Sequence, residues 1–170
     1  VHIELAHPQP NWLLVMETIQ AADHLADKAL ETMRTEQETM ERRRLRVTSE
    51  KVEALTALER LKNYIQIHAS KLSTAQSGLS DVQTLFSNAE NLEQQSLTQS
   101  DAMLAQTLEQ AALFFDQAEQ KATVTFTKAE QDVQVALQDE ANLRRIQMQA
   151  ELQRQQERES YRPQQSSGNS

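Results

Sequence analysis

The feature that most constrains this fold is the stretch from residue 11 to residue 162, which contains no proline and only one glycine, Gly78. Proline and glycine are the residues that most often shape turns, so this stretch offers few places to reverse direction. A β-sandwich or an α/β fold of this length needs many turns. Ala, Glu, Gln, Leu and Arg, all good helix formers, fill the stretch. The sequence therefore predicts an all-α fold.

Two long segments, about 12–72 and 101–160, carry mainly apolar residues at steps of three and four, the spacing of a coiled-coil seam. A helix of about 60 residues is roughly 90 Å long. The expected seam of the first helix is Val15, Ile19, Ala22, Ala26, Ala29, Met33, Glu36, Met40, Arg43, Val47, Glu50 and Ala54, after which it slips by one residue and continues with Leu58, Leu61, Ile65, His68 and Leu72. The expected seam of the last helix is Leu104, Leu108, Ala111, Phe115, Ala118, Ala122, Phe126, Ala129, Val133, Ala136, Glu140 and Leu143.

Two breaks, at residues 73–78 and 95–100, leave room for a short helix over about 79–95. Short connections favour antiparallel neighbours, so we expect the two long helices to pair antiparallel, with Leu72 opposite Ser100. The predicted fold is an elongated antiparallel coiled-coil hairpin of two long helices, with the short third helix at its tip. It forms one helical domain over 11–162.

The two ends of the chain differ in composition from the helical stretch between them. Pro8 and Pro10 disfavour helix and predict an extended arm over residues 1–10, after which Asn11 can cap the first helix. Residues 163–170 are polar and are predicted to be a disordered tail. No apolar run approaches the roughly 20 residues of a membrane span. We therefore expect a soluble protein. The chain has no cysteine, which excludes disulfides but leaves the compartment open between the cytoplasm and export without disulfides.

Charge and motifs narrow the function. The net charge is −8, and residues 73–143 hold eleven acids and two bases, which argues against a general nucleic-acid binder. No nucleophile elbow, phosphate-binding glycine loop or paired-histidine metal motif occurs. His24 between Asp23 and Asp27 lacks a third ligand at helical spacing and is interpreted as solvated. We therefore expect no enzymatic activity, no cofactor and no metal.

Three groups of residues are candidate protein-interaction sites. The first is the basic cluster Arg42, Arg43, Arg44 and Arg46, which either contacts an acidic partner or is a solvated helix face paired with nearby glutamates. Arg43 falls on the seam and is placed to meet Glu130 or Asp132 of the last helix. The other two groups are apolar and each forms either a local core or a docking patch: Trp12 and Leu13 near the start, and Leu85, Phe86 and Leu92 near the tip.

The polar seam positions Glu36, Arg43 and Glu50 recur every seven residues. A buried ionic layer costs stability but can fix register or partner. Either the middle of the hairpin is loosely packed, or a further helix covers it. That helix would be the short one, another copy of the chain, or a different protein.

These features favour a non-enzymatic rod that acts as a spacer, stalk or partner-binding scaffold, with another protein or further copies of itself as partners. In layout, with two long helices, no cysteine and Gln-rich ends such as residues 151–156, the chain resembles the coiled-coil hairpins of bacterial type III secretion and flagellar export systems. Its acidic middle departs from their basic stalk proteins. The alternative is an amphipathic bundle that binds membranes or lipid reversibly.

Overall fold

The computed structural model describes residues 11–72 and 74–163. These residues form α1 (Trp12–Ile67), a single 3-10 turn η1 (Ala69–Lys71), α2 (Ala75–Ser96) and α3 (Asp101–Ser160). Within the two described ranges there is no β-strand, and the all-α prediction is confirmed. The predicted extended arm at 1–10 and all but the first residue of the predicted tail lie outside the described residues.

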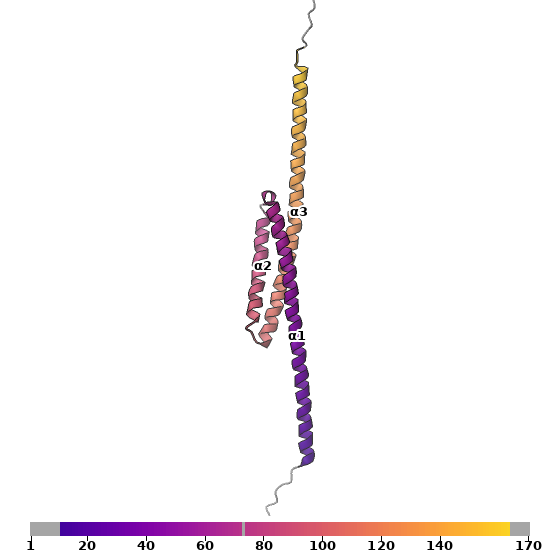
Figure 1. The fold of residues 1–170 in the computed structure, drawn as a ribbon, viewed down its shortest axis with the longest axis vertical. Helices are drawn as coiled ribbons and strands as arrows, with labels where there is room; N and C mark the ends of the chain where they lie inside the picture. The colour runs from indigo at the N-terminus through magenta and orange to yellow at the C-terminus, as the bar shows by residue number, and fades with distance from the viewer. Residues whose placement is uncertain (1–10, 73, 164–170) are drawn as a thin grey trace, which may run out of the picture.

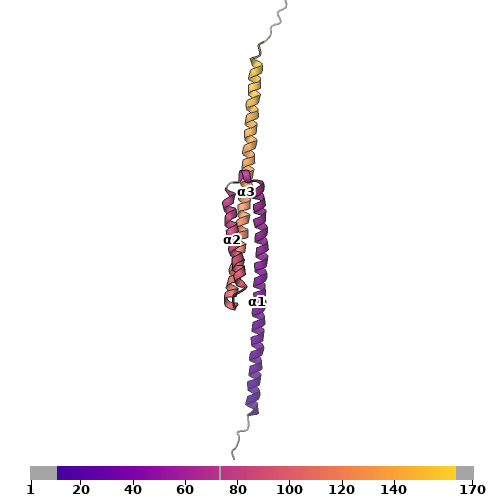
Figure 2. The same cartoon turned by 60° about the vertical axis from the view of Figure 1, so that its left-hand side comes forward.

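The three helices run up, down and up, so the two long helices α1 and α3 are parallel (Figures 1 and 2). Contacts between the long helices follow the same order along both. Glu50 lies beside Asp116, and Lys71, in η1 just after the end of α1, hydrogen-bonds Glu140 further along α3. In an antiparallel pair one of these numbers would fall as the other rises. α1 and α3 are therefore aligned side by side in the same direction.

This direction corrects the predicted hairpin, in which the long helices ran antiparallel and the short helix sat at the tip. With 22 residues, α2 is about 33 Å long, too long for a tip cap. It crosses back along both long helices, and each of the two short connections reverses the chain (Figure 2). Two reversals restore the original direction, so the antiparallel pairs are α1 with α2 and α2 with α3.

The core lies where all three helices run side by side. Phe115 is fully buried at its centre, and its ring meets that of Phe86 on α2 edge-on, with centroids 5.2 Å apart. At one end Met40 packs against the core, and at the other Leu72 closes it. The buried apolar residues are Val47, Ala54, Leu58, Leu61, Ile65, Leu72, Ala75, Val82, Phe86, Ala89, Leu104, Leu108, Ala111, Ala112, Phe115, Ala118, Ala122, Ala129 and Val133.

Polar contacts tie α2 to α1 at the same level. The ammonium of Lys51 lies 2.6 Å from a carboxylate oxygen of Glu93 and 3.6 Å from one of Glu90. The hydrogen bond to Glu93 raises the pKa of Lys51, burial opposes that shift, and the negative charges of Glu93 and Glu90 add to it. Lys51 also lies 5.9 Å from the ring centroid of Phe115. One cation thus links the two helices over the largest core residue.

The helix ends follow local chemistry. The side chain of Asn11 accepts a hydrogen bond from the Leu14 amide at 3.4 Å, which confirms the predicted cap. α1 ends at Ile67, five residues before the expected end, and His68 stacks beside Tyr64 there. α2 begins at Ala75 rather than 79, so Gly78 lies inside a helix and not in a break.

Candidate interaction surfaces

Two helical arms project from the three-helix bundle in opposite directions (Figure 1). The N-terminal arm is residues 12–39 of α1, and every one of them is exposed. The C-terminal arm is residues 141–160 of α3, all exposed except the half-buried Ala150. From the rise per residue the arms are about 42 Å and about 30 Å long. Neither arm packs against another helix in this structure.

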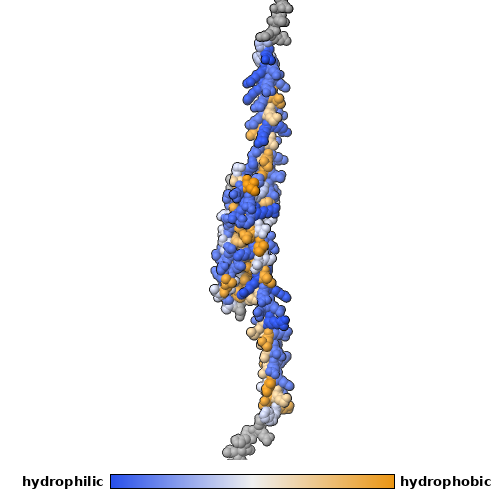
Figure 3. Space-filling model, viewed as in Figure 1, coloured by the Kyte–Doolittle hydropathy of each residue, from blue (hydrophilic) through white to orange (hydrophobic). Residues whose placement is uncertain are grey.

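The N-terminal arm carries an apolar line that continues into the bundle core. From residue 12 to residue 61 of α1, every seventh position is apolar: Trp12, Ile19, Ala26, Met33, Met40, Val47, Ala54 and Leu61. The last three are buried, whereas Trp12, Ile19 and Met33 are 70%, 55% and 64% exposed. Apolar side chains follow the arm in Figure 3. The same apolar line is thus buried inside the bundle and exposed to solvent along the N-terminal arm.

The predicted docking residues Trp12 and Leu13 belong to this arm. Both are exposed, as are Leu14 and Met16. The alternative interpretation of this cluster as a local core is therefore not what the structure shows.

The C-terminal arm carries a shallow groove along one side of α3. It is lined by Leu137, Glu140, Ala141, Arg144, Arg145, Met148, Gln149 and Leu152. Leu137 and Met148 are eleven residues apart, and Phe126 is eleven residues before Leu137, so the three share one face of the helix. Phe126 packs against α1: its ring centroid is 4.9 Å from that of Tyr64, and the Arg60 guanidinium lies 4.1 Å from it. The groove thus continues the side of α3 that contacts α1.

The arms differ in charge. The N-terminal arm holds six acids and two bases, a net charge of −4. The C-terminal arm holds three acids and four bases, a net charge of +1. Opposite net charges favour association of one arm with the other over association of the N-terminal arm with itself.

The basic cluster lies where the N-terminal arm enters the bundle. Arg42, Arg44 and Arg46 are exposed, and Arg46 pairs with Glu50 at 3.7 Å, four residues on. Arg43 is half-buried but does not meet Glu130 or Asp132 as expected. With parallel long helices Glu130 lies near Tyr64, whose pKa is raised by burial and then by the Glu130 charge. The expected pair assumed the opposite direction of α3.

The apolar residues expected at the tip are part of the bundle instead. Phe86 is buried, and Leu85 and Leu92 are half-buried and pack against the core. The structure thus agrees with the local-core interpretation of this group. Of the polar seam positions, Arg43 and Glu50 are half-buried, with Glu50 beside α3, whereas Glu36 on the arm is exposed.

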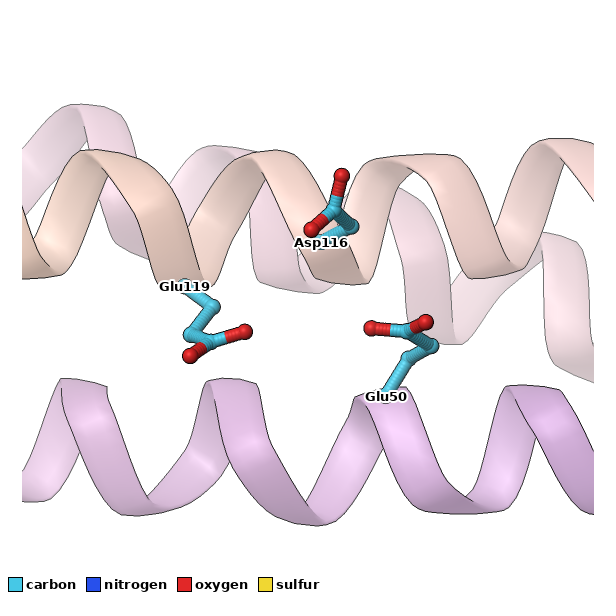
Figure 4. Close-up of side chains that lie close together, drawn as sticks. All are labelled: Glu50, Asp116 and Glu119. Carbon is cyan, nitrogen blue, oxygen red and sulfur yellow. The ribbon is translucent and has the colours of Figure 1, made fainter.

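Sequence reasoning did not identify an acidic cluster between α1 and α3. One carboxylate oxygen from each of Glu50, Asp116 and Glu119 lies within 4.8 Å of the others (Figure 4). Burial raises the pKa of Glu119, and the negative charges of Glu53, Asp116 and Glu50 raise it further. All three are half-buried, and Glu50 already pairs with Arg46. The cluster reads as like-charge crowding, and the absence of a resident metal stays a prediction.

None of the described helices carries an apolar stretch long enough to cross a bilayer. Comparison with known proteins finds no matching family model, no similar curated protein and no similar solved structure.

Proposed function

We propose that this chain is a non-enzymatic helical interaction protein, in which a central three-helix bundle holds out two rigid arms as docking sites for other helices. The observation that carries the proposal is the apolar heptad line of α1. It packs in the core from Val47 onward and continues, uncovered, through Met33 and Ile19 to the start of the helix. The same arrangement suits a spacer or stalk in a larger assembly, such as a secretion-type apparatus.

The free-energy cost of leaving an apolar helix face in water supports this proposal. An isolated helix in water is only marginally stable, and most helical stability in proteins comes from packing an amphipathic face. The N-terminal arm exposes such a face over its whole length. A helix laid along it would complete the coiled-coil seam and remove that apolar surface from water.

The surface hollows also fit a binding protein better than an enzyme. The groove between α1 and α3 at Arg60 and Phe126 has a volume of about 310 Å³ and is open to solvent. Catalytic pockets are usually enclosed and bring polar groups together on a substrate. This groove is open, and although Glu53 and Glu119 share its lining, the Arg60 guanidinium there lies over the Phe126 ring.

Reversible membrane binding is the second candidate, because the exposed cluster Trp12–Met16 is the kind of surface that enters a lipid interface. The charge of the N-terminal arm opposes it. With six acids and only Lys28 and Arg34 as bases, an anionic membrane would repel this arm.

Site-specific photocross-linking in the native cells tests the proposal. A photoreactive residue replaces Met33, on the apolar line, and a control variant carries it at Thr35, on the same arm and also exposed, but away from that line. We expect a discrete protein adduct from position 33 and none from position 35. Equal labelling at both positions, or adducts with lipid alone from position 33, would contradict the proposal. Flotation with anionic vesicles tests membrane binding separately.

A further inference from the structure

We infer that the partner of each arm is a second copy of this chain, bound head to tail. The N-terminal arm of one copy lies along the C-terminal arm of another, in parallel. The two arms then extend the α1–α3 pairing of the bundle from copy to copy. This inference rests on the proposed function and names the occupant of the docking sites.

Direction and face agree with this arrangement. Inside the bundle α1 and α3 run parallel, and α3 contacts α1 through the side that bears Phe126. Past Lys71 the chain's own α1 has ended, yet that side of α3 continues as the groove lined by Leu137, Met148 and Leu152. The space beside the groove is where a continued α1 would lie. The N-terminal arm is the part of α1 that has no α3 beside it, so the arm of a second copy can occupy this space.

The lengths of the two arms are compatible with this overlap. The N-terminal arm has 28 residues and the C-terminal arm 20, so a full overlap leaves about eight residues of α1 before the next bundle begins. The arms project along nearly one line on opposite sides of the bundle (Figures 1 and 2). A second copy placed above the first can therefore engage the C-terminal arm without meeting the first bundle.

Charge complementarity supports the pairing of unlike arms. The groove of the C-terminal arm is lined by two bases, Arg144 and Arg145, and one acid, Glu140, whereas the N-terminal arm has a net charge of −4. Two N-terminal arms would instead bring net charges of −4 together. The charges therefore favour pairing between unlike arms, which is a heterologous contact and adds copies indefinitely unless it closes into a ring.

The experiment mixes two capped variants and measures mass by light scattering after size exclusion. One variant disables the N-terminal arm with Trp12→Asp and Ile19→Asp, and the other disables the C-terminal arm with Met148→Asp and Leu152→Asp. All four side chains are more than half exposed, so the fold is kept. A control adds the same charge within the overlap but off the apolar line, with Gln20→Asp and Ala21→Asp, both at exposed positions.

The wild type and the control are expected to form concentration-dependent species larger than a dimer. Each capped variant alone is expected near the chain mass of 19.4 kDa, and the equimolar mixture at twice that mass and no larger. A wild type that stays monomeric, or that stops at a dimer, overturns the inference, as does assembly of either capped variant alone. A monomeric wild type whose position 33 still cross-links another protein removes the self-assembly and leaves the proposed function standing.

The charge of the groove has its own test. Reversing the two bases that line it, with Arg144→Glu and Arg145→Glu, is expected to weaken assembly at least tenfold. A matched control, with Arg154→Glu and Arg158→Glu, reverses two bases on the same arm but outside the groove lining and is expected to weaken assembly much less. An equal loss from both pairs would contradict docking in the groove.

Discussion

Gly78 shows how one residue sets the approach of two helices. A Cβ added there would lie 2.6 Å from Cγ2 of Thr125 on α3, closer than two carbon atoms can sit without a shift. In the sequence the same glycine looks like a helix breaker. In the structure it lies inside α2, which begins three residues before it, and it allows the close approach of α3.

We expect Gly78→Ala to destabilise the bundle by about 1–3 kcal/mol, because overpacking outweighs the gain in helix propensity. In a Thr125→Ala background the obstructing methyl is gone. There the same substitution is expected to stabilise by about 0.5–1 kcal/mol, the propensity difference alone. Urea unfolding of the four chains in this double-mutant cycle measures both. No change of sign between backgrounds would mean that α2 and α3 do not approach closely here.

Glu119 belongs to the acidic cluster of Figure 4, and its raised pKa has a defined effect on stability. A carboxyl group whose pKa is higher in the folded state than in the unfolded state binds more protons when folded. Its contribution is therefore most favourable below the unfolded pKa and is lost as pH rises through the folded pKa. We expect Glu119→Gln to raise Tm at pH 7 and to have a smaller effect near pH 4.

Thermal unfolding of both chains across that range gives the difference. Asp116→Asn is a useful companion, because it removes one of the charges that act on Glu119. An advantage of Glu119→Gln that is the same at both pH values would show that charge repulsion is not its cause.

At the scale of the helices, the free energy of unfolding resides in the bundle and the arms add little to it. Phe115 is fully buried, whereas Ile146 on the C-terminal arm is 59% exposed. We expect Phe115→Ala to cost about 3–5 kcal/mol, and Ile146→Ala to change stability by less than about 0.5 kcal/mol. Urea unfolding of dilute, monomeric protein measures both. A cost above about 1 kcal/mol for Ile146→Ala would show that the C-terminal arm packs within its own chain.

The sequence predicts these helices better than their arrangement. Periodicity identifies which residues face a neighbour, so α3 has the bounds that the sequence predicts and the buried residues largely follow the two expected seams. The same period reads identically in either direction, and it therefore cannot distinguish parallel from antiparallel helices. The length of α2 decides the direction, and Gly78 hid part of that length by suggesting a break inside it.

The candidate sites also depend on the relative direction of α1 and α3. The exposure of Trp12 and Leu13 follows from α2 and α3 ending before they reach the start of α1. The groove at Leu137 and the cluster at Glu50 and Asp116 arise only when α3 runs parallel to α1. Glu50 and Asp116 are 66 positions apart and share no local sequence pattern. Their contact depends on the direction of α3, which the helical periodicity leaves open.

Across the length of the protein, the two arms point away from each other (Figure 1). Thr18 lies 32 residues before Glu50, and Arg158 lies 42 residues after Asp116, which is level with Glu50. The rise per residue then places Thr18 and Arg158 about 110 Å apart. In an antiparallel hairpin of the long helices the same two residues would be close neighbours, because packed helix axes are only about 8–10 Å apart.

Single-molecule energy transfer between dyes at these two positions measures this separation. The chain has no cysteine, so Thr18→Cys with Arg158→Cys provides the only two labelling sites. Both positions are exposed, and the extreme dilution keeps separate copies apart. The three-helix arrangement predicts almost no transfer. Near-complete transfer would place the two arms side by side and contradict the fold, the docking arms and the head-to-tail assembly together.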